Sequence, residues 1–303
     1  MLHRWIVGLV MTVALAAGPV PAGSATKQSV LVLQSDFGVL DGAVASMKGV
    51  AVGVSPDIHI YDLTHQIEPY NIWQGALRLA QTAEYWPAGT VFVSVVDPGV
   101  GTERKSIVLR TRSGHYFVTP DNGTLTFVVP RLGIDAVREI DEAVNRRKDS
   151  EKSFTFHGRD VYAFTAARLA AGVITFEQVG RALPPEVVTI PHEAARFEGG
   201  VVHGNVQTDD GNYGNIWTNI DRATFGKLGA SRGDRVRIRI LKAGKEVLNL
   251  DVPYVATFGA VEIGKPLLYL NSLDSVSLAI NQDNFAKEYG IGSGPEWSIQ
   301  IRR

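Results

Sequence analysis

An acid and an arginine, Asp97 and Arg104, lie on either side of a glycine-rich turn. The apolar run 91–96 before Asp97 is typical of a buried strand, and the proline and glycine that follow the acid prevent the strand from continuing. The carboxylate therefore lies at the carboxyl end of a strand, where open α/β sheets place their ligand crevices. For these two residues alone, the simpler interpretation is an acid that caps a turn, beside a solvated arginine.

The same order of strand, acid and turn recurs at Asp36 and Asp62. Three such acids suit a divalent metal, but the clustered ligands of metal hydrolases, such as His-x-x-x-His, do not occur in the sequence. Gly99 and Gly101 are not followed by the third glycine that a dinucleotide fingerprint requires. Asp, Arg and His chemistry remains, with carboxylates suited to hydroxyl or ammonium groups. The sequence therefore predicts neither a metal site nor a bound cofactor.

Two further segments carry polar groups that their local structure does not require. His157 stands just before an alanine-rich helix predicted over 161–171, where backbone N–H groups and the positive end of the helix dipole gather. The segment 209–219 places two acids and three asparagines beside aromatic residues, which is more than a hairpin turn needs. For His157 alone, the simpler interpretation is a histidine at a helix start.

The composition bounds the possible partners. The chain has 303 residues, 45% of them hydrophobic, so it is long enough for two globular domains. A net charge of -1 gives no electrostatic footprint for nucleic acid, and we expect no nucleic-acid partner. Cysteine is absent, which excludes disulfides and a thiol nucleophile.

Residues 1–25 are typical of a secretory signal peptide. His3 and Arg4 precede the apolar run 5–17, and small residues then permit cleavage after Ala22 or Ala25. The alternative of an uncleaved membrane anchor is weaker, because the apolar run is too short to span a bilayer comfortably. We therefore expect an exported protein, periplasmic or secreted, with no membrane association after cleavage.

Periodicity divides the rest of the chain into an α/β domain over 26–193 and a β domain over 194–303. In the first, apolar strands alternate with helices, which predicts a mostly parallel, covered sheet. In the second, alternation with period two around a hairpin turn predicts antiparallel strands. The first domain also holds a charged stretch at 141–152, interpreted most simply as a solvated loop. The expected strands are 29–34, 59–65, 91–96, 107–110, 115–118, 236–240, 247–252 and 298–301, and the expected helices are 41–54, with Asp41 as N-cap, 71–85, 125–131 and 161–171.

Six blocks of sequence resemble, in order and spacing, the S-adenosyl-L-methionine (SAM) hydrolase family. Its members are also called SAM hydroxide adenosyltransferases and are related to the fluorinase and chlorinase. The resemblance covers nearly all of the chain after the signal peptide. It implies a C-terminal β-barrel domain, a homotrimer with sites between subunits, and SAM as a substrate rather than a cofactor. The blocks are Ser35–Gly38, Asp62–His65, Val96–Arg104, Pro120–Gly123, Thr155–Asp160 and Tyr213–Asn219.

The resemblance also implies a set of substrate-binding residues. Asp36 would bind both ribose hydroxyl groups, a two-point contact natural for a carboxylate. Tyr70 and Trp73 fall where family members place an aromatic residue near the substrate, although a structural role is an equal alternative for Trp73. The other residues implied are Asp41, Asp210 and Ser272 for the methionine end, Asn215 for the adenine edge, and Tyr213, Trp217 and Phe258 as apolar walls.

The family's catalytic Asp-Arg-His triad matches Asp97, Arg104 and His157. The halogenases resemble each other in lacking that acid and that histidine, and this chain lacks the long insertion that the fluorinase carries near 112–115. The resemblance therefore implies water rather than halide as the nucleophile. The expected reaction is hydrolysis of SAM to adenosine and L-methionine.

The implied chemistry is consistent with these residue types. Attack at the ribose C5′ displaces a neutral thioether, which needs no general acid, so only the nucleophile has to be activated. Arg104 can stabilise hydroxide, Asp97 can orient Arg104, and His157, with an ordinary pKa of about 6.5, can accept the proton. Which of the three accepts it stays open, because coupled groups share their titration.

Two departures from the resemblance keep alternatives open. Leu273 stands where the fluorinase has a basic residue, so the contact to the methionine carboxylate is either different or missing, and export separates the protein from cytoplasmic SAM. The alternatives are a halide adenosyltransferase similar to the chlorinase, and an exported adenosine-binding or SAM-binding protein without turnover.

Overall fold

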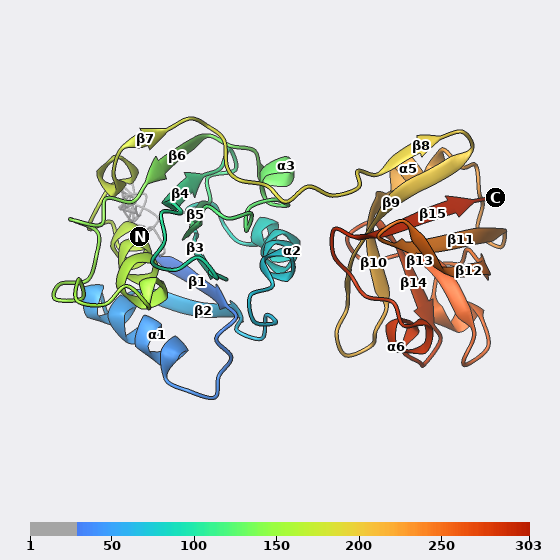
Figure 1. Cartoon of the computed structure of the whole chain (residues 1–303), viewed down its shortest axis with the longest axis horizontal. Helices are drawn as coiled ribbons and strands as arrows, with labels where there is room; N and C mark the ends of the chain where they lie inside the picture. Colours follow the sequence, from blue (N-terminus) through green and yellow to red (C-terminus); the bar gives the residue numbers. More distant parts are fainter. Residues whose placement is uncertain (1–28) are drawn as a thin grey trace, which may run out of the picture.

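The computed structural model describes residues 29–303, which form two domains joined by an extended segment between β7 and β8 (Figure 1). The predicted signal peptide lies outside the described residues. Among the helices of residues 29–303, none is long and apolar enough to cross a membrane.

A seven-stranded sheet forms the N-terminal domain, in the order β2-β1-β3-β5-β4-β6-β7. The first four of these strands pair in parallel and the other three pair antiparallel. This confirms the predicted α/β class with a mostly parallel sheet. The strands are β1 (Val30–Ser35), β2 (His59–Thr64), β3 (Val91–Val95), β4 (Ser106–Arg110), β5 (Tyr116–Pro120), β6 (Ala136–Glu139) and β7 (Ala182–Leu183).

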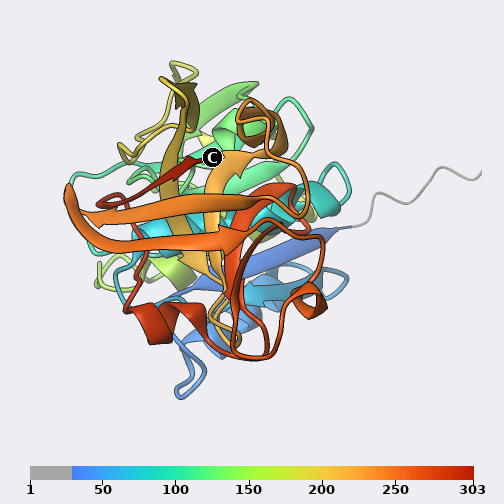
Figure 2. The same cartoon turned by 90° about the vertical axis from the view of Figure 1, so that its right-hand side faces the viewer.

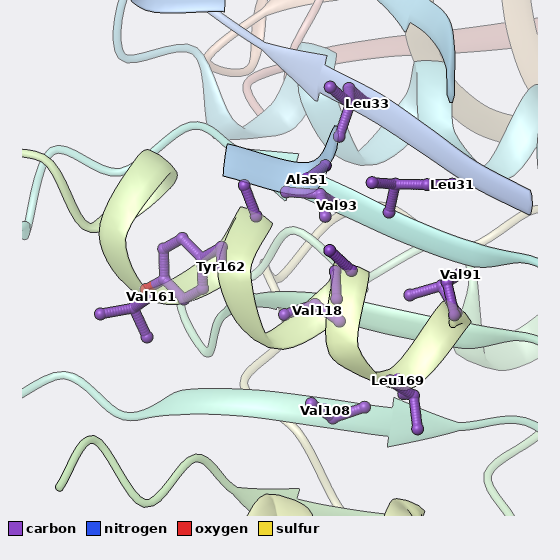
Figure 3. Packing of buried hydrophobic residues seen from close by; sticks show 14 of the residues in the cluster. Leu31, Leu33, Ala51, Val91, Val93, Val108, Val118, Val161, Tyr162 and Leu169 are labelled. Atoms are coloured by element: carbon purple, nitrogen blue, oxygen red, sulfur yellow. The ribbon is translucent and has the colours of Figure 1, made fainter. Parts of the chain in front are cut away.

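Helices cover both faces of this sheet, so strand β1 is buried along its whole length. Leu31 and Leu33 pack toward the helices on one face, as Figure 3 shows, and Val30 and Val32 pack toward the other. The first face holds α1 (Ala43–Val54), a π-helical turn (Gly158–Ala163) and α4 (Phe164–Ala170), and the second holds α2 (Ile72–Thr82) and α3 (Val129–Leu132). Single 3₁₀ turns occur at Ala83–Tyr85 and Phe176–Val179.

The C-terminal domain is an antiparallel sheet of eight strands in the order β12-β11-β15-β9-β10-β14-β13, with β8 beside β9. The two ends of this order meet where Val255 N–H donates to Leu268 O, at 2.9 Å, so the sheet is nearly a closed barrel, as predicted (Figure 2). Its strands are β8 (Arg196–Glu198), β9 (Val201–Asp209), β10 (Ile216–Asp221), β11 (Arg235–Lys242), β12 (Lys245–Pro253), β13 (Pro266–Leu270), β14 (Ser275–Ile280) and β15 (Trp297–Arg302). Short helices α5 (Arg222–Gly226) and α6 (Phe285–Tyr289) and a 3₁₀ turn (Phe258–Ala260) lie between them.

Trp73 lies at the junction of the two domains. Its indole Nε1 donates to the Gln207 carbonyl at 2.7 Å, and its ring packs edge-on against Phe127 and against His192 of the connecting segment. Helix α2, which carries it, lies between the N-terminal sheet and the C-terminal domain (Figure 1). The structural alternative for Trp73 is therefore the correct one.

Several expected elements differ in detail. Helix α1 begins at Ala43 rather than at Asp41, whose carboxylate accepts the Ala43 N–H from two positions outside the helix. The helix predicted over 125–131 is only the single turn α3, because the residues before it form tight turns that start at Gly123. The helix after His157 begins earlier than predicted, with the π-helical turn.

Candidate active site

Asp97 and Arg104 form a buried, two-pronged ion pair just after strand β3. The Arg104 Nε donates to Oδ1 of Asp97 at 2.9 Å, and Nη2 donates to Oδ2 at 2.6 Å. The side chains are only 4% and 11% exposed, respectively. Such bidentate pairs hold both groups in one orientation, so the interpretation of Arg104 as a solvated arginine is wrong.

The glycine-rich turn between these residues makes the pairing possible. Gly101 has a φ of +77°, and a Cβ there would lie 3.2 Å from the Phe154 carbonyl oxygen. Only glycine adopts this conformation readily at so close an approach. The chain can therefore reverse and bring the arginine back to the acid.

His157 joins this pair from the start of the π-helical turn. The Arg104 Nη2 also lies 3.0 Å from Nδ1 of His157. Burial lowers the pKa of Arg104, but the hydrogen bonds to Asp97 and nearby negative charge outweigh burial and raise it. Arg104 is thus a permanent cation between an acid and a histidine, and the three predicted catalytic residues lie together.

Two residues of the cluster were not predicted. Tyr162, fully buried, places its hydroxyl 3.4 Å from Oδ2 of Asp97 and 3.2 Å from the Ser106 hydroxyl. Burial and the neighbouring Asp97 raise the pKa of this phenol, so it stays protonated. No sequence motif marked Tyr162, but its place five residues after His157, at the start of a helix, was the available signal.

Arg146 was placed by sequence reasoning in a solvated loop, and the structure corrects this. Its Nη2 lies 3.0 Å from Nε2 of His157 and donates to Glu142 at 2.7 Å, and its side chain is 7% exposed. Glu142 and Arg146 are four residues apart, a spacing at which opposite charges can meet. This spacing was the only signal in the sequence that Arg146 has a partner.

A cavity of about 290 Å³ opens in front of the cluster. Asp36, Tyr70, Asp97 and His157 line it, whereas Arg104 lies behind them. The Tyr70 N–H donates to Oδ2 of Asp36 at 2.9 Å, with Tyr70 in the left-handed region at φ +68°. That conformation is costly for a tyrosine, and the hydrogen bond that it permits holds one oxygen of Asp36 at the cavity wall.

A series of hydrogen bonds begins at the buried Ser35, next to Asp36, and runs outward to the partly exposed Lys48. The Ser35 hydroxyl lies 2.6 Å from Nδ1 of His65, and Nε2 of His65 lies 3.1 Å from Asp62, which pairs with Lys48. These residue types are those of a serine hydrolase triad, but Ser35 is fully buried and offers no nucleophile. The series instead ties the end of β1 to the end of β2.

A second, larger cavity of about 830 Å³ lies in the C-terminal domain. Asn215 donates through Nδ2 to Asp210, and Tyr269 stands beside them, where burial and the Asp210 charge raise the pKa of its hydroxyl to about 12. Gly214 has a φ of +66°, and any side chain there would overlap Asn284. Six predicted substrate residues line this cavity, namely Asp210, Tyr213, Asn215, Trp217, Phe258 and Ser272.

The predicted site residues therefore fall into two groups in one chain. No residue lines both cavities, and Asp41 lines neither. Leu40, next to Asp41, is fully exposed, and Tyr70 and Tyr213 are more than two-thirds exposed. Within residues 29–303, no group of three or more His, Asp or Glu side chains gathers as metal ligands do.

Comparisons with known proteins cover both domains. Models of the SAM hydroxide adenosyltransferase N-terminal and C-terminal domains match residues 31–180 and 204–298. A fluorinase from an Actinoplanes species is 31% identical over 290 residues, which covers 88% of this chain and 95% of the relative. An (R)-S-adenosyl-L-methionine hydrolase from Methanocaldococcus jannaschii is 41% identical over 202 residues, which covers 65% of this chain and 69% of the relative. A crystal structure of an uncharacterized conserved protein from Thermotoga maritima matches with a TM-score of 0.81 and 34% identity, over 90% of this chain and 100% of that one.

Proposed function

The chain belongs to the SAM hydroxide adenosyltransferase family, and on this premise we propose that it hydrolyses SAM to adenosine and L-methionine. The observation that carries the proposal is the hydrogen-bonded cluster of Asp97, Arg104 and His157 beside Asp36 in one cavity. Resemblance to relatives named as SAM hydrolases supports the same reaction.

In the proposed mechanism, water contacts Asp97 and His157, because these two line the cavity. Arg104 directs its Nε and Nη2 at Asp97 and its Nη1 at Ser106, so it acts as a fixed positive charge behind them. That charge stabilises hydroxide as it forms, and the proton that water loses passes to His157 or Asp97, the two groups that it contacts. The leaving thioether is neutral, so no proton has to be delivered to it.

The substrate is held by groups of both cavities. Asp36, with two oxygens that only accept hydrogen bonds, receives the two ribose hydroxyl groups. Asp210 and Ser272 hold the methionine end, and Asn215 reads the adenine edge between apolar walls. Asp41 contributes to the methionine end from its exposed loop.

We further propose a homotrimer in which each site joins the N-terminal cavity of one subunit to the C-terminal cavity of another. Two observations support this assembly: the cavities share no lining residue, and each is lined by a largely exposed aromatic side chain, Tyr70 in the first and Tyr213 in the second. Mixing Asp36→Ala with Asp210→Ala subunits tests it. Recovered activity in the mixture indicates shared sites, and no recovery indicates sites within one chain.

The reaction is tested on the chain from Thr26 onward. Both sulfur epimers of SAM are supplied in chloride-containing solution, because the hydrolase relatives are named for the (R) form, and products are identified by mass. Adenosine with methionine is the expected result. An excess of 5′-chloro-5′-deoxyadenosine would indicate the halide alternative. Unchanged SAM with a raised melting temperature would indicate a binding protein.

Export is proposed from the sequence of residues 1–25. Expression of the full chain in a bacterium with two membranes, followed by N-terminal sequencing of the periplasmic fraction, is the direct measurement. We expect a mature start at Gly23 or Thr26. A protein that begins at Met1 in the cytoplasmic fraction would overturn the proposal.

A further inference from the structure

Both ring nitrogens of His157 face arginine side chains. Arg104 Nη2 lies 3.0 Å from Nδ1, and Arg146 Nη2 lies 3.0 Å from Nε2. The histidine itself is 4% exposed, so solvent reaches it only through the cavity that it lines. The two guanidinium groups approach from different segments, one from the start of β4 and the other from the 141–152 loop.

The charged and titratable groups around the ring come from three segments. Asp97 and Arg104 stand on the Nδ1 side, and Glu142 and Arg146 stand on the Nε2 side. Tyr162 faces the ring from the π-helical turn, with ring centres 6.5 Å apart. Each arginine is thus accompanied by one carboxylate, but in both cases the arginine nitrogen lies nearer the histidine.

The protonated ring cannot satisfy this environment. An imidazolium has two N–H donors and no acceptor, and a guanidinium is also donor-only. Protonation would therefore point an N–H at a cation on each side of the ring. The neutral ring retains one lone pair and can accept from one arginine. Burial and the charges of Arg104 and Arg146 accordingly lower the pKa of His157, against the opposing effect of Glu142 and Asp97.

Arg146 is held in place at some cost. Its guanidinium stacks over the Phe154 ring at 5.0 Å, and its Nη1 is buried without a hydrogen-bond partner. Burying an unpaired donor is destabilising. A residue kept in such a position is a candidate for a role in the site rather than in folding.

We propose that Arg146 is a positioning residue that keeps His157 neutral, so that the ring retains the one lone pair that the water-activating step requires. Arg146 does not line the cavity and acts only through His157. The kinetic consequence rests on the proposed hydrolysis, whereas the effect on the histidine ring does not.

The kinetic test is the pH dependence of kcat/KM for SAM between pH 5 and 8. Arg146→Gln removes the charge, so the acid limb should move to higher pH by about one unit, the size of shift that a nearby charge produces. Arg146→Lys keeps the charge, so its acid limb should lie close to that of the unaltered chain. Arg147→Gln is the matched control, because Arg147 pairs with Asp160 instead, and its acid limb should not move.

The second measurement follows the His157 ring by NMR titration in the same variants, with His157→Gln used to assign its signal. A higher His157 pKa in Arg146→Gln supports the proposal even if no SAM is consumed. Equal His157 pKa values in Arg146→Gln and the unaltered chain would overturn it, whatever the activity. A shift of equal size in Arg147→Gln would overturn it as well, because the effect would not be specific to Arg146.

Discussion

The two cavities of this protein are built differently. In the N-terminal cavity, the side chains of Asp97 and His157 are buried and both contact Arg104, and Asp36 and Asp97 follow the carboxyl ends of β1 and β3. In the C-terminal cavity, aromatic and amide side chains line a larger space, and only Asp210 and Asp283 carry charge. The first arrangement suits chemistry on a small molecule such as water, and the second suits recognition of a larger apolar group.

This difference predicts that substitutions in the two cavities change different kinetic constants. Changes in the N-terminal cluster should lower kcat, because they remove interactions that matter in the transition state. Changes in the C-terminal cavity should mainly raise KM, because they remove binding that is uniform along the reaction.

The largest expected effect is that of Arg104→Met. It removes the cation and leaves the buried Asp97 unpaired, so we expect kcat to fall by about 10²–10³-fold and the free energy of unfolding to fall by about 3 kcal/mol. Steady-state kinetics and urea unfolding measure the two effects. Arg104→Lys keeps the charge but not the two-point contact with Asp97. It should therefore come closer to the unaltered chain in stability than in activity. Full activity in Arg104→Met would refute the assigned role.

A second effect concerns the segment that presents His157. Asp160, 1% exposed, pairs with Arg147 and Arg159. Burial raises the pKa of Asp160, but these arginines outweigh it and lower the pKa below 3.8. The pairing therefore stabilises the fold above that pH and is lost as the pH falls through the lowered pKa.

Asp160→Asn should accordingly lower the free energy of unfolding by about 2 kcal/mol at pH 7, because it leaves two partly exposed arginines without their acid. The difference from the unaltered chain should shrink as the pH approaches 3. Urea unfolding at pH 7, 5 and 3 measures it. A difference that is constant with pH would show that the carboxylate charge is not the cause.

In the C-terminal cavity, Asn215→Ala should raise KM about 10-fold, the loss of one to two hydrogen bonds, with a much smaller change in kcat. The substitution also removes the side-chain donor to Asp210 and leaves only the backbone N–H of residue 215 bonded to that acid. Steady-state kinetics with SAM provide the measurement, with Asn212→Ala, at the same cavity, as the control. A fall in kcat as large as that of Arg104→Met would contradict the proposal that the C-terminal cavity serves mainly in binding.

The smallest effect is expected on the outer face of the C-terminal sheet. Arg237 and Asp251 pair across β11 and β12, but both side chains are more than two-fifths exposed. Exposed pairs contribute little, because water and salt screen them. Asp251→Asn should therefore leave the melting temperature and kcat unchanged, in contrast to Asp160→Asn.

The sequence by itself determined the features that depend on neighbours along the chain. Alternation of apolar runs with turns placed Asp36 and Asp97 at strand ends, and period-two alternation in β11 identified an antiparallel domain. The six motif blocks identified the family and the Asp97, Arg104 and His157 cluster. These inferences succeeded because strand burial and turn formation are governed by residues a few positions apart.

Only the tertiary structure decided which distant groups meet. The 141–152 stretch looked like a solvated loop, yet Arg146 is buried against His157 because Glu142 and Phe154 hold it there. The sequence around Trp73 is the same whether the ring faces a substrate or the second domain. Only the packing of the two domains places its indole N–H against the Gln207 carbonyl. The separation of the predicted substrate residues into two cavities likewise follows from where each domain closes its own core. Contacts between remote segments depend on the packing of whole elements, which the local pattern of residues does not encode.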